Sequence, residues 1–392
     1  MRNAFYISSK ISTFFSPHKL IFGIGSASLV GKEAKNLGGN RALIVTDKQV
    51  ASAGLIEEVV SSLKTSGLEV SIFDQVQAEP PFQNVDDGAS VARQTGCDII
   101  IGMGGGSSLD VAKGTSIMAK LEGSVLNYVG SDLVPHKGIP KILLPTTAGT
   151  GSEVTRVFVV TDEAEKIKKV VYSDFVLSDV AIVDPRLTVS MPPKVTADSG
   201  IDALIHGIET YVSMNATPFS DILAIEAIRL IGENLPLAFA KPDNMEARCN
   251  MAFAATIAGM AFASGGLGAN HALAYALGID YHLSHGRSNA VLLPYIINYN
   301  RLSSPQRYAR IAQTLGVSTE GLSIYEAGER LVEHLKKLLE FLDVSIHLGS
   351  YGVSADNIPS MVEGTMKQSR LFAPNPRNLT AEDVKEIYTS AL

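Results

Sequence analysis

The first half of the chain alternates short apolar runs with stretches that have helical spacing, such as 53–66 and 84–95. Runs that are apolar at consecutive positions are typical of parallel strands buried on both faces. The predicted strands are RALIVTD (41–47), LEVSIFD (68–74), CDIIIGM (97–103), KILLP (141–145) and VAIVD (180–184). The pattern therefore predicts an α/β domain with a parallel sheet covered by helices on both sides.

One stretch of this half differs from the rest. In VTRVFVVTDEAEKIKKVVYS (154–173), two β-rich runs flank an acidic turn. Two such runs with a short polar connection predict a β-hairpin.

After MPPK (191–194) the pattern changes to long segments rich in Ala, Leu, Ile and Met, which carry helical periodicity. The predicted helices are 196–213, 219–240, 245–263, 270–278, 304–315 and 324–342. The sequence thus predicts two domains: an α/β domain over 1–190 and an all-helical domain over 191–392.

Composition excludes several kinds of partner. The 392 residues carry a net charge of −7, with 46% hydrophobic and 19% charged residues. Without a basic run, a nucleic acid or an anionic membrane is a poor partner. Two distant cysteines, Cys97 and Cys249, fit a reducing compartment and exclude a disulfide framework. Since no segment resembles a signal peptide or a membrane span, we expect a cytoplasmic protein.

A glycine-rich segment, GGGSSLDVAK (104–113), directly follows a predicted strand and begins a predicted helix. Glycines let a ligand approach the backbone, and a helix start offers free N–H groups and a positive dipole end. The segment matches neither the G-x-G-x-x-G fingerprint nor a P-loop. An anion site is one interpretation, and a tight turn is the other.

Two more polar features end predicted strands: PTTAGTGSE (145–153) and Asp47. An aspartate there can bind the two hydroxyls of a ribose and repel a 2′-phosphate, although capping a helix is its commoner role. Because the carboxyl ends of parallel strands lie at one edge of a sheet, the three features together predict a bound dinucleotide.

Polar residues also interrupt the apolar helical half, in DALIH (202–206) and HALAYALGIDYHLSH (271–285). Asp202 and His206 are four residues apart and share a helix face. The segment LGIDYHLSHG reads as a turn that brings His285 back toward His271. One carboxylate and three imidazoles form a plausible site for Fe²⁺ or Zn²⁺, whereas a hydrogen-bonded Asp–His pair is the alternative for the first two.

The chain resembles the iron-containing (group III) alcohol dehydrogenase family over nearly its whole length. The matching motifs are GGGSSLD, PTTAGTGSEVT, GIDALIHGIETYVS, ATPFSD and HGRSNAVLLP. The resemblance implies an N-terminal dinucleotide-binding domain of parallel-sheet type and a C-terminal helical domain, with metal and nicotinamide in the cleft between them.

Carried over position by position, the resemblance implies roles for particular residues. The metal ligands are Asp202, His206, His271 and His285. The pyrophosphate loop is Gly104, Gly105, Gly106 and Ser107, with Asp110 behind it. The second cofactor loop contains Thr146, Thr147, Thr150 and Ser152. Lys168 matches a lysine that reaches the nicotinamide ribose, and Asp47 matches the position where an acid indicates NAD rather than NADP.

The chain departs from the family pattern at two positions. Tyr275 occupies the place of a histidine that serves as a proton relay in many members, and His282 is the nearest remaining histidine, so these two are the candidate catalytic residues. Glu79, in AEPPF (78–82), replaces an asparagine, which puts one contact to the cofactor in doubt.

The resemblance implies an NAD(H)-linked alcohol dehydrogenase or aldehyde reductase that uses Fe²⁺ or Zn²⁺. A polyol dehydrogenase or a lyase similar to dehydroquinate synthase is the alternative within the same fold, and a non-catalytic nucleotide-binding module is the alternative from another class. Arg370 is a candidate contact for a substrate with an anionic tail, of the 4-hydroxybutyrate or sulfoacetaldehyde type, or else a surface arginine.

The β-like segment AFYISSKISTFF (4–15) predicts a homodimer.

Overall fold

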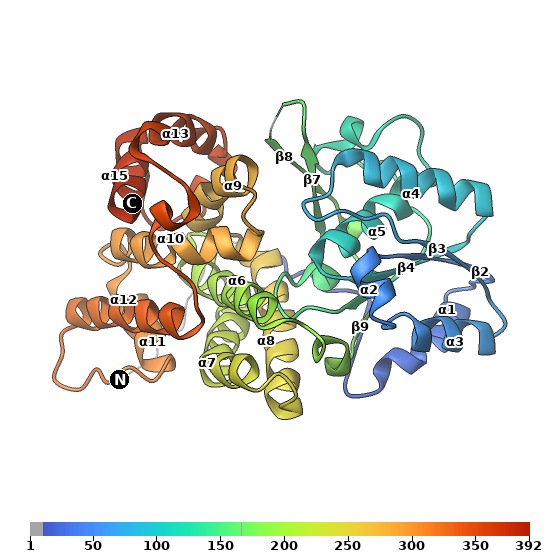
Figure 1. The fold of residues 1–392 in the computed structure, drawn as a ribbon, viewed down its shortest axis with the longest axis horizontal. Helices are drawn as coiled ribbons and strands as arrows, with labels where there is room; N and C mark the ends of the chain where they lie inside the picture. Colours follow the sequence, from blue (N-terminus) through green and yellow to red (C-terminus); the bar gives the residue numbers. More distant parts are fainter. Residues whose placement is uncertain (1–10, 166) are drawn as a thin grey trace. The chain divides into compact units, whose positions relative to one another are not determined.

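The computed structural model describes residues 11–165 and 167–392, and the chain forms two compact units (Figure 1). One unit comprises Ser16–Ser199 and Leu237–Gly259. The other comprises Gly200–Pro236 and Met260–Leu392, together with the described residues 11–15. We call them the sheet unit and the helical unit.

The sheet unit is built on a six-stranded sheet with the order β1-β9-β6-β4-β2-β3, in which all neighbours are parallel. The strands are β1 (Lys19–Phe22), β2 (Arg41–Val45), β3 (Glu69–Phe73), β4 (Ile99–Gly104), β6 (Lys141–Pro145) and β9 (Val180–Val183). All five predicted strands are present, and the predicted α/β class is confirmed. The edge strand β1 was not predicted.

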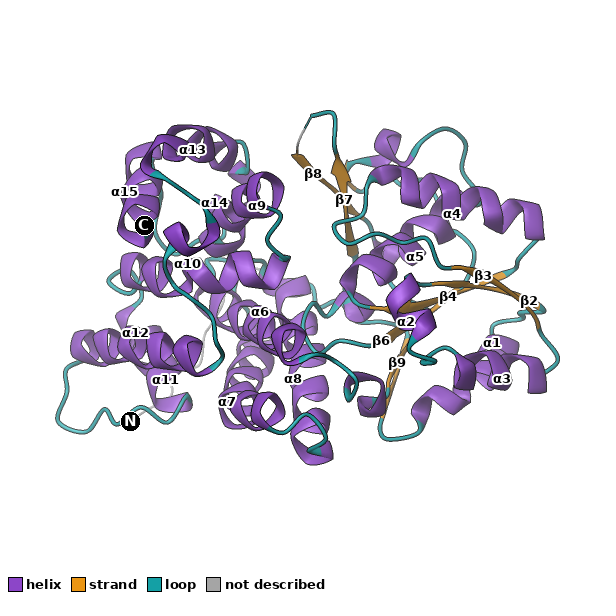
Figure 2. Ribbon diagram, in the orientation of Figure 1, coloured by secondary structure: helices purple, strands orange, loops and turns teal. Residues whose placement is uncertain are grey.

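Alternate residues of the central strands enter two different cores, as the pleat requires. Leu43 and Ile100 pack with α4 (Phe82–Thr95) and α5 (Gly106–Met118) on one face. Ile44 and Ile101 pack with α1 (Val30–Asn36) and α3 (Glu57–Thr65) on the other. The sheet therefore lies between two helical layers (Figure 2), which explains why its strands are apolar at consecutive positions.

The predicted helix over 53–66 is shorter than expected. A short helix, α2 (Lys48–Ser52), follows β2, and a turn with Gly54 at φ 72° separates it from α3. A left-handed residue ends a helix, and glycine adopts that conformation without strain.

The predicted hairpin is confirmed. Strands β7 (Val157–Asp162) and β8 (Ile167–Tyr172) pair in antiparallel fashion, and the two-residue strand β5 (Gly130–Ser131) adds to β8. The described residues also form seven short 3₁₀ helices: η1 (Ser26–Leu29), η2 (Val125–Tyr128), η3 (Ser152–Val154), η4 (Asp174–Val176), η5 (Pro185–Thr188), η6 (Leu348–Tyr351) and η7 (Ala355–Asn357).

The second half of the chain is helical, as predicted. The helices are α6 (Pro193–Val212), α7 (Pro218–Ala240), α8 (Met245–Gly265), α9 (Ala269–Tyr281), α10 (His285–Asn300), α11 (Pro305–Thr314), α12 (Ile324–Phe341), α13 (Ile358–Met366), α14 (Ser369–Phe372) and α15 (Ala381–Ala391). All six predicted helices are present, and α10, α13, α14 and α15 are additional. Helices α9 and α10 pack against each other in a shared apolar core.

The predicted turn before His285 is shorter than expected. Helix α9 continues to Tyr281, His282 ends it in the left-handed conformation (φ 54°), and α10 already begins at His285. Ser284 caps α10, since its hydroxyl accepts a hydrogen bond from the backbone N–H of Arg287 at 3.3 Å. The chain thus reverses within three residues and brings His285 back toward α9.

Two further observations concern membrane-spanning helices and the N-terminal segment. Among the described residues, no single helix has the length and apolarity to span a membrane, and only the pair α8 and α9, bent by 109°, meets those criteria together. Most of the predicted edge segment 4–15 lies outside the described residues, and its described part, 11–15, is not a strand.

Candidate functional site

The sheet unit contains a cavity of about 680 Å³ at the carboxyl ends of four adjacent strands. Its lining includes Asp47 after β2, residues 74–78 after β3, residues 105–108 after β4, and Thr146 with Thr147 after β6. Three of these four positions carry the polar features predicted from the sequence. A cavity at this edge of an open parallel sheet is the usual place for a ligand.

The glycine-rich segment contributes Gly105 and Gly106 to the lining of this cavity, and two of its three glycines have no space for a side chain. Gly104 has φ 147°, and an added Cβ would lie 2.5 Å from Oγ of Ser108. A Cβ on Gly106 would lie 2.7 Å from Cγ2 of Thr150. Helix α5 begins at Gly106, so its first N–H groups and its dipole favour an anion at Ser107.

Asp47 is held by two kinds of contact. Its Oδ1 accepts hydrogen bonds from the N–H groups of Gln49 at 3.0 Å and Val50 at 2.9 Å, so Asp47 caps α2. Its Oδ2 accepts a hydrogen bond from the hydroxyl of Ser108 at 3.0 Å. The helix cap considered from the sequence is therefore present, and the same carboxylate lines the cavity.

Asp110 and Ser152 lie behind the cavity rather than in its lining. Oδ1 of Asp110 accepts a hydrogen bond from the Ser152 hydroxyl at 2.5 Å, and Oδ2 accepts one from the N–H of Val159 at 2.9 Å. The hydroxyl of Thr150 in turn accepts from the N–H of Ser152 at 3.3 Å. Asp110 thus ties the loop 146–152 to α5 and β7.

Lys113 is buried in the core and contacts residues that directly follow this loop. Its ammonium group is fully buried, lies 3.8 Å from Asp110, and donates to Oγ1 of Thr155 at 3.1 Å and the carbonyl of Val157 at 2.7 Å. Burial lowers the pKa of Lys113 to about 8, against the opposing effect of Asp110 and Glu153.

Lys168 is paired with a carboxylate that the family resemblance did not lead us to expect. Its ammonium group forms an ion pair with Glu79 and donates to Oγ1 of Thr161 at 2.9 Å. Glu79 has φ 51°, and its carbonyl accepts from the Thr161 hydroxyl at 3.0 Å. The pair fastens residues 79–81 to the hairpin, and neither partner is among the described residues that line the cavity.

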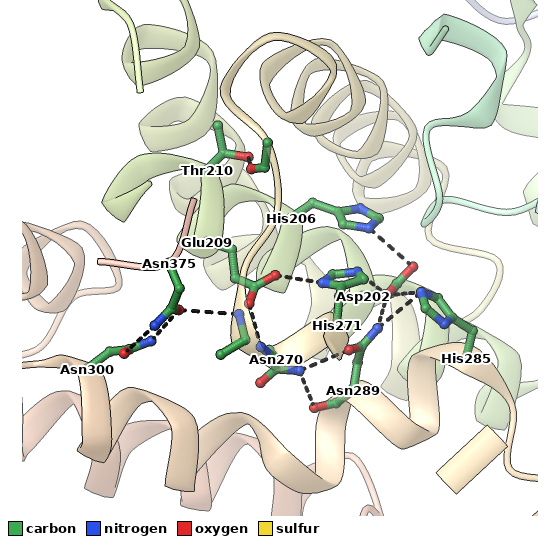
Figure 3. A network of polar contacts seen from close by, with 12 residues as sticks. Asp202, His206, Glu209, Thr210, Asn270, His271, His285, Asn289, Asn300 and Asn375 are labelled. Carbon is green, nitrogen blue, oxygen red and sulfur yellow. Dashed lines mark hydrogen bonds and ion pairs between the residues drawn. The ribbon is translucent and has the colours of Figure 1, made fainter. Parts of the chain in front are cut away.

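The helical unit brings the four predicted metal ligands together (Figure 3). Asp202 and His206 lie one turn apart on α6, with Nε2 of His206 3.7 Å from Oδ2 of Asp202. Nε2 of His271 on α9 and Nε2 of His285 at the start of α10 each lie 3.7 Å from Oδ1 of Asp202.

Three of these side chains are arranged tightly enough to share one ion. Ligand atoms of Asp202, His271 and His285 all lie within 4.8 Å of one another. The ring of His206 stacks on that of His271, with centroids 5.0 Å apart and planes inclined by 17°. Asp202, His206 and His271 are buried, whereas His285 is partly exposed.

The electrostatics of the cluster follow from its burial. Burial acts to raise the pKa of Asp202, but the three histidines and the Asn289 amide outweigh it, so that pKa is lowered. Burial lowers the pKa of His206 to about 4. For His271, burial acts in the same direction, but the Glu209 carboxylate outweighs it and raises the pKa.

The donor set fits a divalent transition metal. Nε2 of His271, which lies 3.7 Å from Oδ1 of Asp202, is buried without a hydrogen-bond partner among the described residues. Buried polar atoms are rarely left unpaired, so an unpaired imidazole nitrogen beside a buried carboxylate suits an ion as its partner. Imidazoles with a carboxylate are ligands that Fe²⁺ and Zn²⁺ accept.

Further polar residues, not predicted from the sequence, surround the ligands (Figure 3). Oε2 of Glu209 lies 2.6 Å from Nδ1 of His271, and the amide nitrogen of Asn289 donates to Oδ1 of Asp202 at 2.9 Å. Asn270 donates to the side-chain oxygen of Asn289 at 2.9 Å, which orients that amide. Helical spacing could have indicated two of them, since Glu209 follows Asp202 by seven residues and Asn289 follows His285 by four.

The two candidate catalytic residues and the candidate substrate contact all lie in the helical unit. The Tyr275 ring is 5.9 Å from the ring of His285, so Tyr275 contacts the cluster. His282 is exposed at the end of α9, and no described contact joins it to the four ligands. Arg370 is half-buried on α14, which packs against α9, the helix that carries His271 and Tyr275.

The fold and the arrangement of these residues define an enzyme class. The family model for iron-containing alcohol dehydrogenases matches residues 17–185, and the model for the C-terminal domain of the same family matches residues 196–392. The chain belongs to the iron-containing alcohol dehydrogenase family, so the predicted family and enzyme class are confirmed.

Several relatives are similar over nearly their whole length. The chain is 43% identical over 372 residues to long-chain-alcohol dehydrogenase 1 of Geobacillus thermodenitrificans (strain NG80-2), covering 94% of each chain. A solved 1,3-propanediol oxidoreductase is 39% identical with a TM-score of 0.95, covering 98% of this chain and 100% of that one. The sulfoacetaldehyde reductase from Bifidobacterium kashiwanohense, solved in complex with NAD⁺, is 29% identical with a TM-score of 0.88, covering 98% and 99%.

Proposed function

We propose that this protein is a metal-dependent oxidoreductase that transfers a hydride between NAD(H) and a small primary alcohol or aldehyde. The observation that carries the proposal is the buried cluster of Asp202, His271 and His285, with His206 beside it. The buried carboxylate of Asp202 faces the unpaired Nε2 of His271, and this arrangement is costly unless an ion joins the two groups. Fe²⁺ is the proposed ion and Zn²⁺ the alternative.

The cavity of the sheet unit is the proposed dinucleotide site. The start of α5, at Gly106 and Ser107, is suited to the pyrophosphate, because it offers backbone N–H groups and a helix dipole. Asp47 is suited to the adenosine ribose, since its carboxylate lines the cavity with a fixed orientation. A similar protein, the sulfoacetaldehyde reductase, is known in complex with NAD⁺, which supports the choice of cofactor.

The chain's own residues would perform binding and orientation. The four ligands would hold the metal, which would polarise the substrate oxygen and lower the pKa of an alcohol. Alcohol oxidation would then pass a hydride from the substrate carbon to C4 of NAD⁺ and release the hydroxyl proton, giving aldehyde and NADH. For that proton, Tyr275 is the better-placed candidate, because it contacts His285 whereas His282 is exposed.

Three alternatives would give different results in the same assays. A polyol dehydrogenase would prefer a vicinal diol to a simple alcohol, and a lyase similar to dehydroquinate synthase would not oxidise NADH with any aldehyde. A nucleotide-binding module would bind NADH without metal and without turnover. Metal analysis combined with NADH oxidation over a panel of aldehydes and ketones distinguishes these cases.

The substrate class is proposed as a short neutral primary alcohol, with a substrate that carries an anionic tail as the second candidate. Relatives named for 1,3-propanediol and for sulfoacetaldehyde represent these two possibilities, whereas another relative is named for a long-chain alcohol. The observation that favours the second candidate is the position of Arg370 on a helix that packs against α9. A guanidinium binds a carboxylate or sulfonate through two hydrogen bonds.

We also propose that the chain forms a homodimer through the β1 edge of the sheet. Strand β1 is the outermost strand, and Phe22 and Ile24 at its end are exposed, with Ile24 60% accessible. Phe22 contacts Phe253, which is also exposed, so the apolar residues are contiguous. An unpaired edge strand with apolar side chains favours association with a second chain.

The first prediction concerns metal dependence. His285→Ala should lower metal content and reduce kcat by about 100-fold or more, because metal polarisation contributes several kcal/mol in the transition state. Metal analysis and steady-state kinetics measure both. His347→Ala, at an exposed histidine of the same unit, is the control and should change neither. Full activity of a metal-free His285→Ala protein would contradict the proposal.

The second prediction concerns cofactor choice. Asp47→Asn should narrow the preference for NADH over NADPH, because it removes the charge that repels a 2′-phosphate. Asparagine caps helices as well as aspartate does, so the melting temperature should change little, which separates charge from capping. Ratios of kcat/KM for the two cofactors measure the effect. Equal use of both cofactors by the unmodified protein would show that Asp47 is only a helix cap.

The third prediction concerns Arg370. If the substrate has an anionic tail, Arg370→Ala should raise KM for anionic aldehydes with a loss of about 1.5–3 kcal/mol, the range for a hydrogen bond to a charged group. Neutral aldehydes should be unaffected. Lys367→Ala removes a nearby exposed cation and is the control. An equal effect of Arg370→Ala on both classes, or none, would favour a neutral substrate.

The fourth prediction concerns association. The full chain should sediment as a dimer at micromolar concentration, and Phe22→Arg should weaken the dimer by placing a charge in the apolar contact. Met214→Arg, at an exposed apolar residue of the helical unit, is the matched control. A monomeric unmodified chain would rule out the homodimer.

A further inference from the structure

The start of α9 lacks the usual local helix cap. The preceding residue, Gly268, has no side chain, so the first N–H groups of the helix need acceptors from elsewhere. The N–H of Ala269 donates to Oδ1 of Asn375 at 3.2 Å, and the N–H of Asn270 donates to Oε1 of Glu209 at 2.6 Å. A Cβ on Gly268 would lie 3.0 Å from each of these oxygens, so the acceptors are packed directly against the helix start.

The second oxygen of Glu209 contacts the next residue. Oε2 lies 2.6 Å from Nδ1 of His271, and the Glu209 side chain is buried. An ionised carboxylate only accepts hydrogen bonds, so Nδ1 is the donor and carries the proton. In the neutral imidazole the lone pair is then on Nε2, the nitrogen that lies 3.7 Å from Asp202 and has no other partner among the described residues.

We propose that Glu209 is a positioning residue for the metal centre, which fixes the His271 tautomer and aligns the start of α9 through its two oxygens. The inference rests on the metal centre of the proposed function and assigns a role to a residue outside its ligand set. A carboxylate that accepts from a ligating histidine fixes the ring orientation and increases the basicity of the coordinating nitrogen. Loss of Glu209 should therefore weaken metal binding without removing a ligand.

A purely structural role would give a different pattern. Asn375 caps the same helix through Ala269 but has no described contact with His271. Asn375 is buried and also exchanges hydrogen bonds with Asn300. Its replacement therefore shows how a loosened start of α9 affects metal binding while the contact between Glu209 and His271 is retained. Asn375→Ala is therefore the matched comparison for Glu209→Gln.

Glutamine at position 209 has nearly the same shape as glutamate, but one of the two acceptor oxygens is replaced by a nitrogen that donates. With its oxygen toward the N–H of Asn270, its amide N–H₂ faces Nδ1 of His271 and favours the tautomer protonated on Nε2. That proton would occupy the coordinating position. Glu209→Gln should thus retain the hydrogen bond to the N–H of Asn270 and weaken the binding of a metal by His271.

The test measures the affinity of the full chain for Zn²⁺ and Co²⁺ by competition with a chelator, with thermal unfolding as the check of folding. Glu209→Gln should weaken Zn²⁺ binding by about 10–100-fold. Asn375→Ala should lower the melting temperature and change the affinity less than about threefold, well below the loss expected for the positioning residue. Equal losses in the two variants, or unchanged affinity in Glu209→Gln, would overturn the inference.

The outcomes separate this inference from the proposed function. An unmodified chain that binds neither Zn²⁺ nor Co²⁺ contradicts the metal centre itself. An unmodified chain that binds both ions while Glu209→Gln binds them equally well contradicts only the role of Glu209.

A second measurement serves if Glu209→Gln does not fold. The unmodified protein, labelled with ¹⁵N at its eight histidines, reports the tautomer of each ring by NMR. In the metal-free protein, the ring of His271 should carry its proton on Nδ1, and His271→Gln should identify this signal by removing it. Assignment of the Nε2-protonated form to His271 would overturn the inference.

Discussion

The buried carboxylate of Asp202 is the charge around which the helical unit is organised. Its side chain is 2% exposed and faces three imidazoles and the amide of Asn289. A buried ion loses several kcal/mol of hydration, so its surroundings must supply hydrogen bonds and opposite charge. Apart from His206, which lies on α6 itself, those partners come from α9 and α10, so the arrangement of these helices around α6 is coupled to one side chain.

The sheet unit follows another constraint, which is the convergence of parallel strand ends at one edge. Asp47, the glycines 104–106 and Thr146 follow three adjacent strands. Their side chains also support one another, since Ser108 fixes Asp47 and Asp110 fixes Ser152. The loops are thereby held in place by hydrogen bonds from within the unit.

Elements with strong local patterns could be predicted from the sequence. The central strands were predicted because they are apolar on both faces, and the cluster of Asp202 and three histidines because these residues are polar within apolar helices. Strand β1 was missed because it lies at the edge, where Leu20 and Phe22 are exposed and only four residues pair. Helix α10 was missed because Pro294 lies inside it and its first turn is polar.

The residues that support the ligands were less predictable, for a physical reason. Glu209 and Asn289 act through side-chain hydrogen bonds to residues distant in sequence, 62 positions away for Glu209 and His271. A polar residue at helical spacing is more often solvent-exposed, so the sequence alone does not distinguish the two cases. Only the packing of α6 against α9 reveals that Glu209 is buried.

The ion pair between Lys168 and Glu79 has a consequence for the chemistry of the hairpin. A lysine with no counterion attracts phosphates, but this ammonium group is already neutralised and only 6% exposed. An anion that approached it would have to compete with a carboxylate held by its own backbone to Thr161. The ammonium group is instead committed to the Glu79 carboxylate and the Thr161 hydroxyl, so the pair holds residues 79–81 against the hairpin.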